Sequence, residues 1–284
     1  MTTEPEPAAQ PAAGKPPETL QEYFVLELRR LRRARSLSQS QLAERINYSP
    51  GLVGMVETLQ RHPTADFTKR CHDVLETGGA LSRLLPLMDR EAYPSWFRSY
   101  VTLEAEALAI ETLETQMVPG LLQTEDYARA VLAAAWPPKS PVETERRLAA
   151  RLDRHRIFDR ETPPLLSVVI DESALRRPVG GADVMAAQLR RLVEIAHRPR
   201  VKLNVLTFEQ SAHTTMDGAF VVLDLPRQER VAYIESTGKG QVLAAPQDVE
   251  TLTQTFGAIR SEAVPSAESV AFIDRIREEL YEHR

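Results

Sequence analysis

Residues 38 to 57 read SQSQLAERINYSPGLVGMVE, and they predict two short helices joined by a tight turn. Ser38 and Gln41 have the S-x-x-Q spacing of a capping box, which begins a helix. Asn47 stands where the chain must turn, and asparagine tolerates the left-handed backbone conformation. Ser49 followed by Pro50 is a second helix start, because serine is a good N-cap and proline suits the first helical position.

The apolar residues of this stretch place the two helices against each other. Leu42, Ala43 and Ile46 share one face of the first helix, and Val53 and Val56 lie three residues apart on the second. Two short helices with the second one exposed is the geometry that inserts a recognition helix into the major groove. A helical hairpin inside a larger α domain is the alternative, but a generic hairpin rarely matches every constrained position. The stretch therefore predicts a helix-turn-helix that binds duplex DNA.

Further helices flank the motif. Leu20, Phe24, Leu28 and Leu31 predict an amphipathic helix before it, and Thr64 begins a later helix that ends at Gly78-Gly79. The other face of the earlier helix carries Arg29, Arg30, Arg32, Arg33 and Arg35. The apolar face of the later helix carries Phe67, Cys71, Val74 and Leu75.

The motif Ser38-Gln39-x-x-Leu42-Ala43 and the later Glu57…Arg61-x-Pro63 resemble the Cro/cI-type (XRE) helix-turn-helix family. The exposed positions of the second helix (Pro50, Gly51, Gly54, Met55) lack the bidentate side chains that discriminate bases. Leu59 stands where that family usually has glycine, and readout is expected to use Ser49, Gln60, Arg61, His62, Lys69, Met55 or DNA shape. The residues predicted to lie at the DNA are Arg33, Arg35, Ser38, Gln39, Ser49, Pro50, Gly51, Met55, Gln60, Arg61 and Lys69.

Charge and composition suit a site-specific regulator. The chain of 284 residues has a net charge of −5, whereas residues 20 to 90 hold 11 Lys and Arg against 8 Asp and Glu. The single cysteine, Cys71, excludes an internal disulfide framework, and no apolar run is long enough to span a bilayer, so we expect a cytoplasmic protein. The predicted divisions are a disordered proline-rich leader (1–19), the helix-turn-helix domain (20–78), a linker with a short helix (79–94) and a C-terminal domain (95–284).

The C-terminal domain is predicted to be a mixed α/β (α+β) domain, so that the whole chain is an all-α helix-turn-helix domain followed by an α/β one. Residues 95–115 are expected to form a helix, as are 124–135, 143–159, 185–196 and 247–283. LLSVVI (165–170) and VKLNVLTF (201–208) predict strands, and residues 219–225 and 231–236 predict a β-hairpin. Strand, helix, strand and then hairpin imply a mixed sheet covered by helices.

Three stretches of this domain carry a second resemblance: Trp96-Phe97 through Ala107, Val118-Pro119-Gly120-Leu121-Leu122-Gln123 through Arg129, and Asp171-Glu172 through Gly180. They are similar to the C-terminal domain of a large actinobacterial regulator family, in which an XRE helix-turn-helix precedes a domain of unknown function. The resemblance implies control of transcription and a small partner protein encoded beside the regulator. It implies neither a ligand nor a catalytic residue.

Polar residues at strand ends are the candidates for a pocket in this domain, because pockets form at strand ends of α/β sheets. A hydrolase would pair Asp171 and Glu172 with His213, either directly or around a metal. The structural alternative is that Asp171 caps the next turn while Glu172 pairs with Arg176 at i+4. Because no pair of a nucleophile and a general base can be identified in this sequence, we expect a sensory or partner-docking domain and not an enzyme. The expected pocket comprises Trp96, Tyr100, Glu104, Gln123, Tyr127, Asp171, Glu172 and His213.

The expected partners follow from these interpretations. Besides double-stranded DNA, they are a second copy of the chain, the small neighbouring protein and a small-molecule effector, with no cofactor, metal or membrane. A single helix-turn-helix with little base-reading chemistry covers few base pairs, so a homodimer on two half-sites is predicted. Its interface is expected in the C-terminal domain, since the helix-turn-helix has few spare apolar faces.

Overall fold

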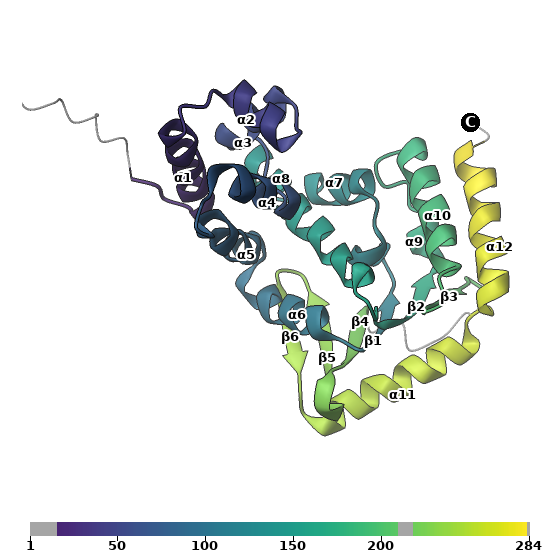
Figure 1. Ribbon diagram of the computed structural model, residues 1–284. Helices are drawn as coiled ribbons and strands as arrows, with labels where there is room; N and C mark the ends of the chain where they lie inside the picture. Colours follow the sequence, from purple (N-terminus) through teal and green to yellow (C-terminus); the bar gives the residue numbers. More distant parts are fainter. Residues whose placement is uncertain (1–15, 210–217, 283–284) are drawn as a thin grey trace, which may run out of the picture. The chain divides into compact units, whose positions relative to one another are not determined.

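The computed structural model describes residues 16–209 and 218–282, and it divides into two compact units between Met88 and Asp89. The first unit is helical, and the second is built on a six-stranded sheet with helices (Figure 1). The predicted fold class, an all-α helix-turn-helix domain followed by an α+β domain, is confirmed. No helix among the described residues is both long and apolar enough to cross a membrane.

The first unit packs short helices around one apolar core. Phe24 and Leu28 on the first helix, Ile46 on the second and Phe67 on the fourth are all fully buried or nearly so, which confirms the predicted apolar faces. Cys71 is buried among them, and burial raises the pKa of its thiol to about 12. The helices are α1 (Leu20–Ala34), α2 (Gln39–Ile46), α3 (Pro50–Glu57), α4 (Ala65–Leu75) and the part of α5 (Ala80–Ala92) up to Met88.

The second unit contains one mixed sheet in the order β3-β2-β1-β4-β5-β6. The strands β1, β2 and β3 are parallel to one another, whereas β4, β5 and β6 continue the sheet from β1 in antiparallel fashion. The strands are β1 (Ala109–Glu114), β2 (Leu165–Asp171), β3 (Val201–Leu206), β4 (Phe220–Asp224), β5 (Arg230–Ser236) and β6 (Lys239–Leu243).

Helices cover both faces of this sheet because successive side chains of a strand point to opposite faces. Val168 and Ile170 of β2 join a core with α10 and α12, whereas Val169 joins a second core with Phe256 and Ile259 of α11 (Figure 1). The helical elements are α6 (Ser95–Glu106), η1 (Gly120–Leu122), α7 (Glu125–Ala133), α8 (Pro141–Asp153), η2 (Arg154–Asp159), α9 (Glu172–Arg176), α10 (Ala182–Ala196), η4 (Pro226–Gln228), α11 (Pro246–Glu262), α12 (Ser266–Arg277) and η5 (Glu278–Glu282).

The strand at 165–170, the strand at 201–208 and the hairpin are confirmed, but the helix predicted for residues 95–115 is wrong. Helix α6 ends at Glu106, and residues 109–114 are the strand β1. Pairing decides this, since β1 is hydrogen-bonded to β2 on one side and β4 on the other. Strand β6 was not anticipated at all.

Candidate DNA interface and C-terminal site

The turn between α2 and α3 has the predicted geometry. Ser38 and Gln41 form a complete capping box at the start of α2. Asn47 ends that helix in the left-handed conformation, with φ 57° and ψ 51°. The Ser49 hydroxyl accepts a hydrogen bond of 3.2 Å from the Leu52 amide, and Pro50 is the first residue of α3. The helix-turn-helix is therefore set by local backbone chemistry.

A buried carboxylate at the end of α3 holds that helix on α1 and α2. The guanidinium of Arg32 donates two hydrogen bonds to Glu57, of 2.6 and 2.8 Å, and the Gln39 amide donates a third of 2.8 Å. Arg29 also pairs with Glu57. Burial acts to raise the pKa of Glu57, but the hydrogen bonds from Arg32 and Gln39, together with the charges of Arg32 and Arg29, outweigh it and lower the pKa. Three helices thus meet at one ionised group.

The side chains predicted to contact DNA lie on the surface of the first unit, with one partial exception. Gln39 is half-buried, and its amide nitrogen is committed to Glu57. His62, one of the residues considered for readout, is only 4% exposed, so that expectation is wrong. The exposed residues of the set are Arg33, Arg35, Ser38, Ser49, Pro50, Gly51, Met55, Gln60, Arg61 and Lys69.

The outward face of α3 carries little hydrogen-bonding chemistry. Pro50, Gly51 and Met55 are exposed there, and none of them offers a polar side-chain group to a base edge. Leu59, just beyond the helix, has φ 65°. Leu59 therefore adopts a left-handed backbone conformation, which glycine adopts more readily than leucine.

In the second unit, a buried ion pair joins α6 to η2. Arg154 donates hydrogen bonds of 2.7 Å from both Nε and Nη2 to the two carboxylate oxygens of Glu104. The Tyr100 hydroxyl donates a third, of 2.6 Å, to Glu104 Oε1. Burial and the adjacent Glu104 carboxylate raise the pKa of Tyr100 well above its usual value. Tyr100 thus remains a neutral hydrogen-bond donor.

Two further carboxylates stand beside this pair. Leu113 and Ile234 both pair with Phe220 of β4, so continuing the two registers by one residue puts Glu114 and Glu235 in one row across the sheet, on the same face. Burial, followed by the repulsion of Glu235, raises the pKa of Glu114 to about 8. Burial also raises the pKa of Glu235, whose carboxylate accepts a 3.1 Å hydrogen bond from Tyr233. The cluster therefore contains three glutamates.

Two arginines face these glutamates from α8 and η2. Arg151 and Arg154 are three residues apart, which puts them on one side of a helical segment. Burial and the neighbouring Arg154 lower the pKa of Arg151 to about 10. Arg151 donates a hydrogen bond of 2.9 Å to the side-chain oxygen of Gln123. The Gln123 amide nitrogen in turn donates a hydrogen bond of 2.8 Å to the Val118 carbonyl.

Aromatic rings line the other side of the cluster. Tyr100 stacks on Tyr233 with ring centroids 4.2 Å apart, and Phe97 lies 5.1 Å from Tyr100 and beneath the Arg154 guanidinium. Gly240 of β6 has no side chain where Tyr233 and Trp96 approach its backbone, so this glycine makes room for both rings. A small cavity of about 40 Å³ lies against Glu104, Glu114 and Arg154.

The predicted pocket residues are only partly brought together. Trp96, Tyr100, Glu104 and Gln123 all belong to or contact the cluster. Tyr127 is fully buried, and its hydroxyl accepts a hydrogen bond from the Val118 amide.

Asp171 and Glu172 make the local contacts that the structural alternative predicted. Asp171 caps α9, and Glu172 forms an ion pair of 2.5 Å with Arg176. Glu172 also accepts a hydrogen bond from the Phe208 backbone amide. His213 lies outside the described residues. In the described part of the chain, no three His, Cys, Asp or Glu side chains are grouped to hold a metal ion.

Sequence reasoning missed Glu114, Arg151 and Arg154. The two arginines stand in a strongly charged helical segment, which is typical of a solvated surface. Their spacing of three residues puts both arginines on one side of a helical segment. This spacing indicates a site only once Glu104 is known to face that side.

Two families match the chain. A family described as a helix-turn-helix domain matches residues 24–85, and a family described as a domain of unknown function (DUF5753) matches residues 97–275. No curated protein and no solved structure matches.

Proposed function

Since the chain belongs to the DUF5753 family and carries a helix-turn-helix domain before it, we propose that it is an XRE-type transcription regulator. It binds duplex DNA as a homodimer in the cytoplasm, and its second unit responds to an effector or a small partner protein. The observation that carries the DNA-binding part is the α2–α3 geometry, with Ser38, Asn47 and Ser49 each in its structural role and α3 exposed. An actinobacterial origin is part of the same proposal.

Phosphate contacts supply most of the affinity in this proposal. Arg35, Arg61 and Lys69 are exposed cations of the first unit, whereas the exposed face of α3 offers only the Met55 side chain and backbone groups. Phosphates carry no direct sequence information, so specificity is expected to be shallow. Thymine methyl contacts and DNA shape provide the remainder.

A mobility-shift titration against the promoter region flanking its own gene tests the DNA-binding part. We expect affinity to fall steeply with salt, because phosphate neutralisation releases counterions. Arg61→Ala or Lys69→Ala should weaken binding to all fragments alike and reduce the salt slope by about 1, while Ser49→Ala should act mainly on the preferred fragment. Lys202→Ala, which removes an exposed charge from the second unit, is the matched control. Salt-insensitive binding, or no binding to any fragment, would contradict the proposal.

The ionisable cluster of the second unit supports the sensing part. Three glutamates face two arginines there, and the pKa of Glu114 is raised to about 8, so an incoming ionic group changes the charge balance of a partly buried site. Such a site can couple ligand binding to DNA affinity by about 1–3 kcal/mol. We place the sensing function in the residues around Glu104, Glu114 and Arg151.

A reporter assay in cells, combined with DNA titrations of the purified full chain, tests this part. Glu114→Gln should alter regulation in cells while leaving the DNA affinity of the effector-free chain unchanged. Glu268→Gln, an exposed change on α12, is the control and should alter neither. If instead the purified chain turned over a substrate, and Glu104→Ala or Glu172→Ala abolished turnover, the unit would be an enzyme.

A further inference from the structure

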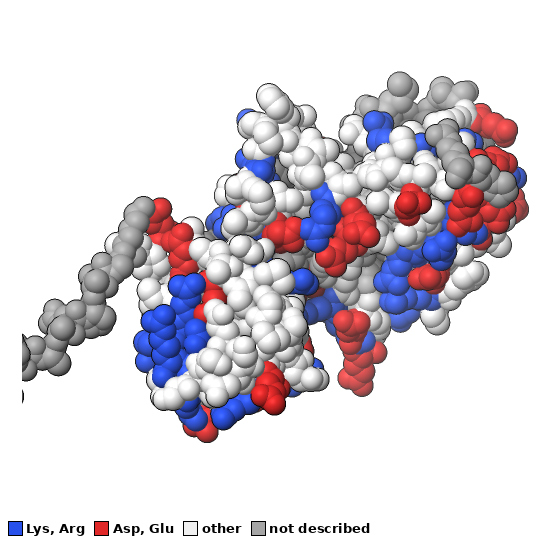
Figure 2. Space-filling model, turned by 90° about the horizontal axis from the view of Figure 1, so that it is seen from above, with Lys and Arg blue, Asp and Glu red and all other residues white. Residues whose placement is uncertain are grey.

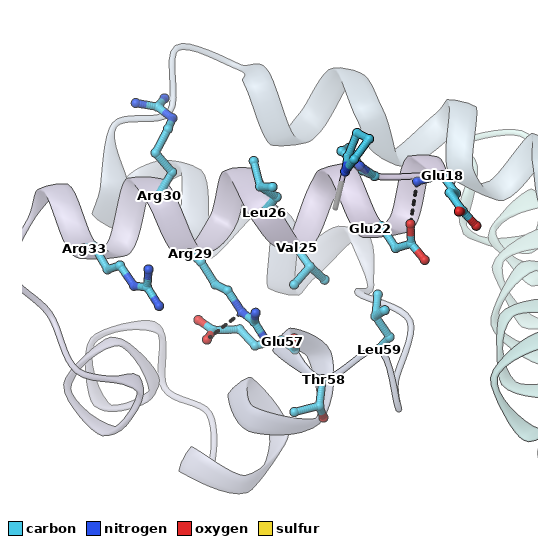
Figure 3. A pocket seen from close by; sticks show the side chains of 12 residues that line it. Glu18, Glu22, Val25, Leu26, Arg29, Arg30, Arg33, Glu57, Thr58 and Leu59 are labelled. Atoms are coloured by element: carbon cyan, nitrogen blue, oxygen red, sulfur yellow. Dashed lines mark hydrogen bonds and ion pairs between the residues drawn. The ribbon is translucent and has the colours of Figure 1, made fainter. Parts of the chain in front are cut away.

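Helix α1 has a side that no other described part of the chain covers. Leu26 is 49% exposed and Tyr23 46% exposed on this helix. Next to Leu26 runs a groove of about 880 Å³, whose apolar floor and far wall include Val25 and Leu59 (Figure 3). The expectation that the helix-turn-helix unit has few spare apolar faces is therefore wrong at this surface.

Charge is separated along the same side of α1. Glu18 and Glu22 lie at its beginning, and Arg29, Arg30 and Arg33 lie toward its end, with Leu26 between them (Figure 3). Figure 2 shows an acidic patch and, beside it, a larger basic patch on the first unit. Arg30 pairs with Glu27 and Arg29 with Glu57, while Arg33 makes no ion pair with any described residue.

This pattern is complementary to itself when the helix is reversed. Residues 22 and 30 are each four positions from Leu26, which is about 6 Å along a helix axis. A two-fold axis at Leu26 would therefore place Glu22 of one copy opposite Arg30 of the other, with Arg33 one turn further on. A two-fold interface repeats every contact, so each such pair occurs twice.

From this geometry we infer that the α1 side bearing Leu26 is the homodimer contact, formed by two copies packed antiparallel. The inference rests on the proposed homodimer and names its surface. A phosphate backbone would match the basic end of α1 and be repelled by Glu18 and Glu22, and an acidic peptide would match only that same end. Only a second copy of α1 matches both ends and the apolar middle together.

Charge reversal tests the contact directly in the full chain without DNA. The variant Arg30→Glu with Arg33→Glu makes the side uniformly acidic, and Glu18→Arg with Glu22→Arg makes it uniformly basic. Each variant alone should dimerise at least 10-fold more weakly than the unmodified chain by sedimentation equilibrium. An equimolar mixture of the two should recover the dimer, because every opposed pair is then of opposite sign. Arg45→Glu with Lys202→Glu reverses two exposed charges away from α1 and should leave the dimer intact.

A cross-link provides a second, independent measurement. Leu26→Cys puts a thiol at the two-fold axis, and mild oxidation should yield a disulfide-linked dimer. The native Cys71 is buried and does not compete. Ser40→Cys, exposed on α2, is the matched control and should remain uncross-linked.

The outcomes separate this inference from the proposed homodimer. A single-chain mass for the unmodified protein at micromolar concentration would overturn both. If both charge-reversal variants dimerised as tightly as the unmodified chain, or if their mixture did not form the dimer, the α1 contact alone would be overturned.

Discussion

Each unit of the molecule buries a glutamate that accepts two hydrogen bonds from one arginine guanidinium, but the two glutamates have different surroundings. Glu57 accepts hydrogen bonds from Arg32 and Gln39 and pairs with Arg29; among the described residues no second carboxylate shifts its pKa, which is lowered. Glu104 is met by Arg154 and Tyr100, with Glu114 and Glu235 nearby, and the pKa values of those two neighbours are raised.

The difference teaches what each network is for. A carboxylate on α3 whose lone pairs are filled by donors from α1 and α2 fixes the position of these three helices and has nothing left for a ligand. A cluster with more carboxylates than guanidinium groups keeps one carboxyl, Glu114, whose protonation an incoming ionic group can change. The first network is a clamp for α3, and the second is the better place for a signal to enter.

Breaking the clamp has the largest expected effect. Glu57→Ala leaves Arg32 buried without its partner, and removing one member of a buried pair costs about 3–5 kcal/mol. Because both tryptophans belong to the second unit, unfolding of the first is best followed by amide hydrogen exchange. Glu27→Ala is the control, since its partner Arg30 is exposed and exposed ion pairs contribute little to stability. Equal effects of the two changes would show that Glu57 is no clamp.

The corresponding change in the second unit should cost less. Glu104→Ala also strips Arg154 of its partner, but Glu114 stands within electrostatic reach and can ionise in its place. We expect a loss of about 2 kcal/mol, below the range for a buried charge left alone. Tryptophan fluorescence during urea unfolding reports this unit. A loss as large as that of Glu57→Ala would remove the distinction between the two networks.

The sequence was most informative where the deciding physics is local. Ser38, Asn47 and Ser49 act through hydrogen bonds to residues within four positions or through their own backbone angles, so their roles could be predicted. Asp171 as a cap and Glu172 paired with Arg176 were also legible, because both are local contacts.

The remainder depends on segments far apart in the chain. The helix predicted for residues 95–115 rested on the spacing of Glu104, Glu106, Glu111 and Glu114, whereas pairing with β2 and β4 makes residues 109–114 a strand. Arg154 meets Glu104 across 50 residues, and no periodicity encodes that contact. The glycine in β6, a residue that weakens strands, hid the sixth strand.

The pH dependence of stability should reveal the surplus carboxylate. Below pH 4.5, the usual pKa of this side chain, Glu114 is protonated in both the folded and the unfolded chain; between pH 4.5 and about 8 only the folded chain keeps the proton. Its contribution is therefore full at low pH and is lost as pH rises through this window, by at most about 1.4 kcal/mol per pH unit.

Glu114→Gln should flatten that slope in urea unfolding of the second unit. Glu268→Gln, exposed on α12, should leave the slope as it was. Parallel slopes for the unmodified chain and Glu114→Gln would mean that Glu114 ionises normally, and the second network would then hold no unusual charge.

The smallest effect belongs to the backbone of the first unit, where strain is present although the charges are satisfied. Leu59 has φ 65°, a conformation that costs an L-residue about 1–2 kcal/mol. Leu59→Gly relieves that strain, but the greater freedom of glycine in the unfolded chain costs about 0.5–1 kcal/mol and some side-chain contact is lost. We therefore expect the free energy of unfolding to rise by only about 0.5 kcal/mol. Asn47→Gly, at φ 57°, is the matched control and should bring no gain, because asparagine already tolerates this conformation and caps α2. Hydrogen exchange at a fixed protein concentration measures both changes. A gain at Asn47 equal to that at Leu59 would show that glycine helps at any left-handed position in this unit, and that Leu59 carries no special strain.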